Sequence, residues 1–357
     1  MTSTQSATAT ATAPATVTVT ATNDPALNEL LVFDTATHAL LQRLPAGGKG
    51  GVGGNASGIA HLARRWLAAV NHGSSTVGVF ERVTGTQTFE ALAVVNTASP
   101  PVSVTFGVNG MYVAGTSTVE SFELPTFART GVAALPTTSP TASVSQIGGV
   151  QRHLLVTTKD DPSPGTVEVV FLRDDGSVSG LVTTVHAPVG TMTPFGFVSF
   201  PDGTSLVTLA HSSQLALFKS TAAAFEFADA VTSDQVAPCW TTRYGKYVYV
   251  VNAGSKTVSR LVTTGSNVFV DADVAADITT GNPTDVDQLL GCLVVLDHAA
   301  AGTSQTSQTS TSQATSQATS QATSHLTWFD IDRFGVLTRA GQPVDLGVPG
   351  ANGACVL

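Results

Sequence analysis

The glycine-rich stretch from Ala46 to Asn55, AGGKGGVGGN, contains residues that could bind phosphate. Its KGGVG core opens a variant phosphate-binding loop. In such a loop, backbone N–H groups cradle the phosphates, a closing lysine reaches them, and a Ser or Thr hydroxyl holds Mg²⁺ at a helix N-terminus. Here Gly54 stands at the position of the closing lysine, and Asn55 at that of the hydroxyl. We therefore expect a flexible connector, with a nucleotide site as the alternative.

The other residue types that could do chemistry lack the spacing of metal or nucleophilic sites. The chain has eight histidines, among them His61, His153, His186, His211 and His298. None of the eight is part of an H-x-H or H-E-x-x-H pattern. Asp271, Asp273 and Asp277 lack the glycine and glutamate of a calcium loop, and no serine lies in a G-x-S-x-G elbow. We expect no metal and no cofactor.

The composition of the chain indicates which partners it is not expected to bind and whether its cysteines form disulfides. Only 11% of the 357 residues are charged, and the formal net charge is −9. Nucleic acids and anionic membranes bind Lys/Arg patches, which this chain lacks, so we expect neither as a partner. Cys239, Cys292 and Cys355 are widely spaced, which indicates buried reduced thiols rather than a disulfide framework.

No apolar run reaches the 18 or so residues of a membrane span. Residues 1–16 have neither the basic start nor the apolar core of a secretory signal, and we expect them to form a disordered tail. These features favour the cytoplasm. The alternative is a secreted protein whose leader is missing, in which case the sequon Asn55-Ala56-Ser57 matters.

An internal repeat organises the rest of the chain. The segments VNHGSSTVGVF (70–80) and VNAGSKTVSRL (251–261) share the pattern V-N-x-G-S-x-T-V at an offset of 181 residues. Four repeats of about 45 residues give that offset, and 40–45 residues is typical of a four-stranded propeller blade.

The same apolar strand recurs seven times. The copies begin at Val17, Leu67, Tyr112, Leu154, Leu206, Tyr247 and Leu293. A turn and a second strand follow each copy, an outer strand comes next, and a short inner stretch precedes each copy. We therefore predict an all-β fold, a seven-bladed β-propeller with four antiparallel strands per blade.

The first blade lacks its inner strand, and the C-terminal residues GACVL (353–357) supply one. Blade 1 would then comprise about 17–44 plus 353–357, closing the ring and removing open sheet edges. We expect residues 17–357 to form one propeller domain and the protein to be a monomer.

Two segments depart from the repeat. SGIAHLARRWLAAV (57–70) has helical spacing of its apolar residues, but the repeat register predicts two strands that turn at Ala63–Arg65. Residues 301–324 contain a polar Ser/Thr/Gln tract that cannot bury a core. We predict a disordered surface loop between the second and third strands of blade 7.

With the seven copies and the pattern Y-V-x-V-x-N-x-G-S, the chain resembles the lactonase-type seven-bladed propellers. This group includes 6-phosphogluconolactonase and the fungal 3-carboxy-cis,cis-muconate lactonising enzymes (carboxymuconate cyclases), and it overlaps the YVTN-repeat proteins. The resemblance covers about 17–357 without the insert. In this register AGGKGGVGGN joins two blades and opens no helix, so a phosphate loop is not expected.

The resemblance implies a ligand site at the mouth of the central channel, where the inner strands begin. Lactone-handling relatives are expected to carry His, Arg and Glu there, but the matching positions here hold neither His nor Arg. Asp285 is the acid expected near the mouth, either as a general base or in an Asx-type turn after Pro283. The other candidate ligand-binding residues are Gln146, Phe195, Trp240, Thr284 and Asn352.

Two functions follow as expectations. The first is a lactonase or carboxymuconate cyclase-like propeller that binds a small molecule at the channel mouth, with catalysis unproven. The alternative is a non-catalytic propeller scaffold for a protein or glycan partner, because propellers host many unrelated functions.

Overall fold

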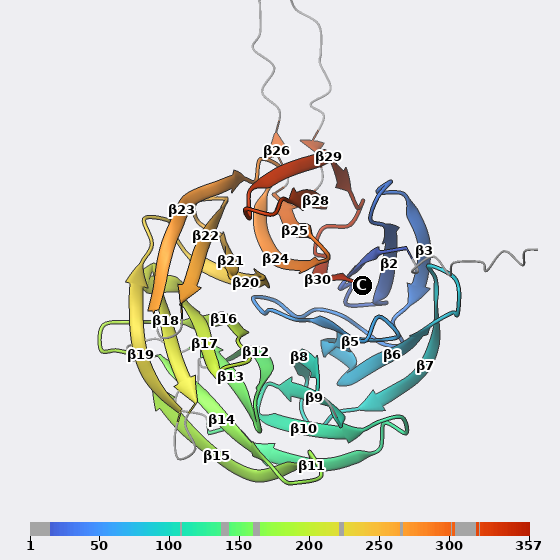
Figure 1. Ribbon diagram of the computed structural model, residues 1–357. Coiled ribbons are helices and arrows are strands. Elements are labelled where there is room, and N and C mark those ends of the chain that lie inside the picture. Colours follow the sequence, from blue (N-terminus) through green and yellow to red (C-terminus); the bar gives the residue numbers. More distant parts are fainter. Residues whose placement is uncertain are drawn as a thin grey trace, which may run out of the picture.

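Seven four-stranded antiparallel sheets form a ring around a central channel (Figure 1), which confirms the predicted seven-bladed propeller. The computed structural model describes residues 15–107, 109–136, 143–159, 165–220, 225–264, 267–300, 302–303, 319–320 and 322–357. Within each blade the strands lie in chain order from the channel outward, except in blade 1, where the C-terminal strand is innermost.

Blades 1 to 4 contain the following strands. Blade 1 has β30 (Asn352–Val356), β1 (Val17–Ala21), β2 (Glu29–Asp34) and β3 (Leu40–Pro45); blade 2 has β4 (Ile59–Leu62), β5 (Trp66–Asn71), β6 (Thr76–Arg82) and β7 (Phe89–Asn96). Blade 3 has β8 (Pro101–Phe106), β9 (Gly110–Gly115), β10 (Thr118–Glu123) and β11 (Arg129–Ala134); blade 4 has β12 (Ser143–Val150), β13 (His153–Lys159), β14 (Thr166–Leu172) and β15 (Val178–His186).

Blades 5 to 7 complete the ring. Blade 5 has β16 (Pro194–Ser199), β17 (Thr204–Leu209), β18 (Gln214–Ser220) and β19 (Phe225–Thr232); blade 6 has β20 (Pro238–Tyr244), β21 (Tyr247–Asn252), β22 (Thr257–Thr264) and β23 (Asn267–Asp277). Blade 7 has β24 (Asn282–Leu289), β25 (Cys292–Ala299), β28 (Thr323–Ile331) and β29 (Leu337–Asp345). Two short 3₁₀ turns, η1 (His72–Ser74) and η2 (Ala210–Ser212), follow β5 and β17.

The second strand of each blade forms the core because neighbouring blades cover both of its faces. Every residue of β1, β9 and β17 is buried, which explains why these strands lack polar alternation. The outermost strands instead alternate between exposed and partly buried residues. The apolar clusters lie between blades, so packing of one blade on the next stabilises the ring.

The chain ends close the ring as predicted. Thr18 pairs with Val356 and Val19 with Cys355 in antiparallel register. Val17 and Leu357 exchange two backbone hydrogen bonds, with N–O distances of 2.8 and 2.9 Å. Residues more than 330 positions apart in the sequence therefore share one sheet, and blade 1 has no open inner edge.

The segment with helical spacing forms two strands, β4 and β5, joined by a turn at residues 63–65. The segment therefore follows the strand register of the repeat and not the helical spacing of its own apolar residues. Ala63 and Arg64 adopt left-handed backbone conformations, with φ of 52° and 59°, as a tight two-strand turn requires.

Two other predicted segments fall mostly outside the described residues. Of the predicted tail, only residues 15 and 16 are described. In the predicted insert, the two-residue strands β26 (Gly302–Thr303) and β27 (Thr319–Ser320) pair with each other, and Thr323 and Ser324 begin β28. The three cysteines are free thiols, Cys239 and Cys355 buried and Cys292 partly buried.

The propeller has two faces that differ in their connections. Connectors between blades lead into the inner strands at one face, which we call the connector face; the inner strands turn back at the other, the turn face. Among the described residues, no helix is long and apolar enough to cross a membrane.

Candidate functional site

The glycine-rich connector between β3 and β4 crosses the channel at the connector face. Figure 1 shows this light-blue segment passing over the middle of the ring. The indole Nε1 of Trp240 in blade 6 donates to the backbone oxygen of Asn55 at 2.8 Å. The backbone N–H of Ala56 donates to Ser145 O in blade 4 at 2.9 Å. The connector, which runs from blade 1 to blade 2, is thus anchored to blades 4 and 6 across the channel.

The side chain of Asn55 holds the connector from two further directions. Its Nδ2 donates to Val102 O in blade 3 at 2.6 Å, and its Oδ1 accepts from Asn352 Nδ2 in blade 1 at 2.8 Å. Asn55 is 1% exposed, so the predicted sequon presents no accessible acceptor amide in the folded chain. A Cβ on Gly58 would lie 2.3 Å from Asn352 Oδ1, which explains why glycine is needed where the two segments meet.

The connector also covers the predicted aromatic site. Phe195 and Trp240 pack edge to face, with ring centroids 5.2 Å apart, and Ala56 belongs to the same buried cluster. Only 5% of Phe195 and 6% of Trp240 is exposed. The ammonium group of Lys159 lies 5.7 Å from the Phe195 ring centroid and donates to Gly54 O. These aromatic rings are therefore packed beneath the connector.

A cavity of about 270 Å³ lies within the channel, with Ser57 of the connector in its wall. The polar side chains around it include His61, Gln146, Thr241, Asp285 and Asp287. These residues come from blades 2, 4, 6 and 7, so no single blade forms the cavity. Among the described residues that line it there is no lysine or arginine.

Asp285 and Asp287 lie two residues apart on β24 and reach the neighbouring inner strand β30. Asp285 Oδ2 accepts from Ala354 N at 3.0 Å, and Asp287 Oδ2 accepts from Val356 N at 2.8 Å. Residues two apart on a strand share a face, so both carboxyls can accept hydrogen bonds from the same neighbouring strand. They join blade 7 to the C-terminal strand of blade 1.

Burial raises the pKa of both carboxyls. The pKa of Asp285 is raised to about 8 by loss of hydration, which outweighs its hydrogen bonds from Val286 N and Ala354 N. Burial likewise raises the pKa of Asp287 to about 7, against the opposing effect of the Val356 and Gln288 N–H groups. Asp285 is 4% exposed, whereas Asp287 is partly exposed. Asp287 is therefore the more accessible acid, with a pKa near neutrality.

His61 adds a second titratable group to the cavity. Burial, assisted by the charge of Arg64, lowers the pKa of His61, so its imidazole is neutral at pH 7. Its Nδ1 is buried and lies within hydrogen-bonding distance of no described residue, and the same holds for the hydroxyl oxygen of Thr241. Both residues line the cavity, but these two atoms point into the protein and are closed to solvent.

The structure separates the predicted site residues into three groups. Asp285 and Gln146 line the cavity, although the Gln146 amide is held by the backbone of Phe197 at 2.8 and 3.1 Å. Phe195, Trp240 and Asn352 contact the connector or pack beneath it. The Thr284 hydroxyl instead lies 3.4 Å from both Leu296 O and His298 Nε2, within blade 7.

Neither Asp287 nor His61 was expected at the site, because the expected site residues lie at the start of each inner strand. The alternation in Asp285-Val286-Asp287 was the available signal, since a strand places both carboxyls on one face. Asp285 also lies inside β24 at an irregularity in its pairing with β25, rather than in a turn after Pro283.

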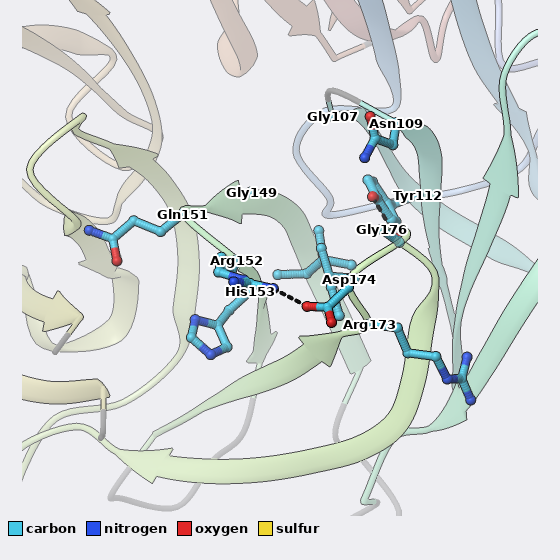
Figure 2. A pocket seen from close by; sticks show the side chains of 12 residues that line it. Gly107, Asn109, Tyr112, Gly149, Gln151, Arg152, His153, Arg173, Asp174 and Gly176 are labelled. Carbon is cyan, nitrogen blue, oxygen red and sulfur yellow. Dashed lines mark hydrogen bonds and ion pairs between the residues drawn. The ribbon is translucent and has the colours of Figure 1, made fainter. Parts of the chain in front are cut away.

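Figure 2 shows a second cavity, of about 320 Å³, at the turn face between blades 3 and 4. Arg152 and Asp174 pair across it, but their side chains are 74% and 98% exposed. Arg173 points away from the cavity and donates to Ser177 Oγ and Val178 O, while the Tyr112 hydroxyl donates to Gly176 O. The Arg152, Arg173, Asp174 and Tyr112 side chains already have partners within the protein, and the ion pair between Arg152 and Asp174 is exposed, so the channel cavity is the stronger candidate.

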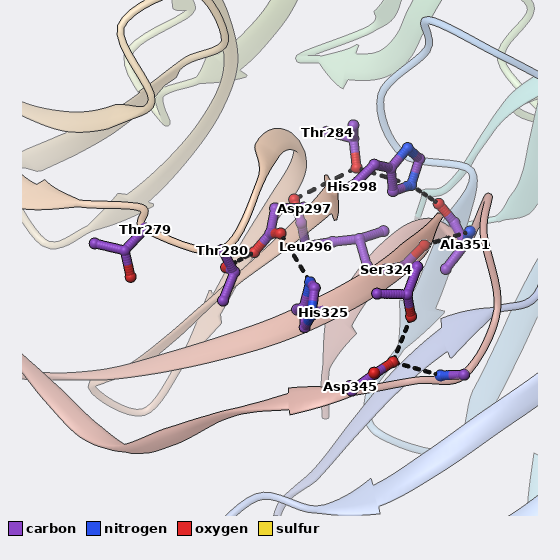
Figure 3. Close-up of polar contacts among 12 residues, drawn as sticks. Thr279, Thr280, Thr284, Leu296, Asp297, His298, Ser324, His325, Asp345 and Ala351 are labelled. Atoms are coloured by element: carbon purple, nitrogen blue, oxygen red, sulfur yellow. Dashed lines mark hydrogen bonds and ion pairs between the residues drawn. The ribbon is translucent and has the colours of Figure 1, made fainter. Parts of the chain in front are cut away.

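A polar network in blade 7 supports the channel mouth (Figure 3). Asp297 is fully buried and accepts from Thr280 Oγ1 and from His325 Nδ1, the latter at 3.2 Å. His298 Nε2 lies 2.6 Å from Ala351 O, and Ala351 N donates to Ser324 Oγ at 3.1 Å. These contacts fix the backbone just before Asn352. Among the described residues, no group of three or more His, Cys, Asp or Glu side chains is placed to hold a metal ion.

The fold and its channel define a seven-bladed propeller with a polar central cavity and a connector across one mouth. No protein-family model matches the sequence, and no curated protein matches it. Solved structures do match this chain in fold. A provisionally assigned 6-phosphogluconolactonase of Bacteroides fragilis has a TM-score of 0.68 at 14% identity, over 98% of this chain and 99% of that one.

Two further solved structures are similar. A protein from Lactobacillus plantarum gives a TM-score of 0.67 at 18% identity, over 97% of this chain and 100% of that one. A periplasmic gluconolactonase of Pseudomonas aeruginosa gives 0.66 at 13% identity, over 96% and 98%. At these identities the similarity establishes the fold that the chain shares with lactonase propellers.

Proposed function

We propose that this protein hydrolyses a lactone in the central channel, with Asp287 as the general base. The observation that carries the proposal is a channel cavity with an accessible carboxyl whose pKa is raised to about 7. A base with a pKa near the working pH is ionised often enough to act and basic enough to take a proton. The shared fold with lactonase propellers supports this reaction class.

In this mechanism the Asp287 carboxylate takes a proton from a water molecule as the water oxygen attacks the lactone carbonyl. The ring C–O bond then breaks, and the proton passes from Asp287 to the departing ring oxygen, which gives the open hydroxy acid. The polar residues that line the cavity beside Asp287, among them Ser57, His61 and Thr242, supply hydrogen bonds to the lactone oxygens.

Asp287→Asn tests the proposal directly. We expect the variant to lose at least about a hundredfold in kcat/KM, the usual range for removal of a general base. In the wild type, kcat/KM should rise with pH and level off above about 7, as Asp287 ionises. Asp273→Asn is the matched control, because that side chain is exposed on outer strand β23. Unchanged turnover in Asp287→Asn contradicts the assignment of the base.

The same assay separates Asp287 from the sequence-predicted base Asp285. Because Asp285 is almost fully buried and accepts from Val286 N and Ala354 N, we assign it to positioning of β30. Asp285→Asn should therefore lower stability more than turnover. If the Asp285→Asn variant is folded but has lost all turnover, Asp285 and not Asp287 is the general base.

The second candidate function is a non-catalytic scaffold for a protein or glycan partner. The position of the connector favours a scaffold, because the connector covers the Phe195–Trp240 pair and keeps these rings from a ligand. Absence of turnover with lactones and in carboxymuconate cyclisation, at any pH between 5 and 9, would support the scaffold.

A further inference from the structure

We infer that the channel cavity selects an uncharged polyhydroxylated lactone and rejects phosphorylated or carboxylated ones; this inference rests on the proposed function. Asp285 and Asp287 line the cavity, and among its described lining residues none is a lysine or arginine. An anionic group on the ligand would lose its hydration without gaining a cationic partner.

The charged groups near the channel do not change this expectation. The Lys159 ammonium lies against the Phe195 ring and is bonded to Gly54 O, on the connector and outside the cavity lining. Burial and the Arg64 charge lower the pKa of His61, which keeps the imidazole mainly neutral at pH 7, and Arg64 itself is not among the residues that line the cavity. The whole chain is acidic, with a formal charge of −9, so its field also steers anions away.

The cavity instead offers groups that suit hydroxyls. Ser57, His61 and Thr242 line the cavity, and Asp287, which also lines it, is an acceptor that is partly exposed. Hydroxyl groups donate and accept at once, so a neutral polyol can satisfy an imidazole, a hydroxyl and a carboxylate together. A cavity of about 270 Å³ is sized for one small molecule.

The decisive comparison uses glucono-δ-lactone and its 6-phosphate, which differ only in the phosphate group. We expect kcat/KM for the uncharged lactone to exceed that for the phosphate by about a hundredfold or more, because the phosphate would be desolvated in the cavity without a cationic partner. A ratio near one, or a preference for the phosphate, overturns the inference.

A charge-insertion variant tests the cause. Ala60 lines the cavity, and Ala60→Lys adds a cation there; the ratio should fall by at least about tenfold. Thr232→Lys adds the same charge at an exposed position on β19 and should leave the ratio unchanged. If both lysine variants, shown to be folded by circular dichroism, retain the wild-type ratio, cavity charge is not the determinant and the inference fails.

Binding separates this inference from the proposed function. Calorimetry with δ-gluconolactam, a slowly hydrolysed uncharged analogue, and with its 6-phosphate measures charge preference without turnover. If no lactone is hydrolysed but only the uncharged lactam binds, the hydrolase proposal fails and the charge preference stands. If neither lactam binds, or the phosphate binds at least as tightly, the inference fails.

Discussion

Two aspartates in the channel make stability depend on pH. Their pKa values in the folded state, about 8 for Asp285 and about 7 for Asp287, exceed the ordinary value of 3.8. The native state therefore holds protons that the unfolded state releases. This contribution to stability is complete below about pH 4 and is lost as pH rises through about 7 and then 8.

We expect the free energy of unfolding to fall by about 1.4 kcal/mol per pH unit for each aspartate across that window. Urea unfolding at pH 5, 6, 7 and 8 measures the slope, and the double variant Asp285→Asn/Asp287→Asn should flatten it. His61 acts in the opposite direction, because its pKa is lowered and its contribution is lost as pH falls below 6.5. The difference between wild type and double variant isolates the aspartates. Equal slopes would contradict the raised pKa values.

At the scale of elements, the connector between β3 and β4 covers the channel at the connector face. Its amide and carbonyl groups bond to blades 4 and 6, and the Asn55 side chain bonds to blades 1 and 3. A segment whose buried polar groups are all held by different blades resists opening, since each lost partner leaves an unsatisfied group. The connector thus ties several blades together at this face and contributes to stability.

Asn55→Ala removes the side-chain bonds and leaves Val102 O and Asn352 without this partner. We expect a loss of about 1–3 kcal/mol in the free energy of unfolding, together with increased solvent exposure of Trp240, seen as stronger quenching of its fluorescence by acrylamide. Asn96→Ala, at an exposed position on β7, is the control. An Asn55→Ala variant with unchanged stability and quenching would show that the connector is not held by these bonds.

At the scale of the whole molecule, the ring depends on its last strand. β30 pairs with β1, and its Ala354 and Val356 N–H groups donate to the carboxyls of β24, so it joins blade 7 to blade 1. Its five residues are all buried. Without β30, β1 would expose an unpaired edge and the channel carboxyls would lose their N–H partners.

Deletion of residues 352–357 should therefore convert a single cooperative unfolding transition into aggregation or partial folding. Size-exclusion chromatography and thermal melting by circular dichroism measure this outcome. A synthetic peptide of residues 350–357 added in trans should restore part of the native signal. A truncated protein with the wild-type melting temperature and elution volume would refute this view of ring closure.

The sequence by itself determined the architecture, because each blade is a local unit of about 45 residues that repeats. The repeat fixed the inner strands, overrode the helical pattern around Ala63, and identified the C-terminal strand as the partner of Val17–Ala21. It also showed that AGGKGGVGGN joins two blades. All of these depend on strand order and turn position, which the chain encodes locally.

Only the tertiary structure decided the contents of the channel. The pairing of Asn55 with Asn352, the covering of Trp240 by the connector, and the gathering of His61 with Asp287 join segments that are distant in the sequence. Their relative positions depend on how seven blades pack around one axis and how deep each inner strand lies. No local pattern specifies that depth, because it is set by the sum of all contacts between blades.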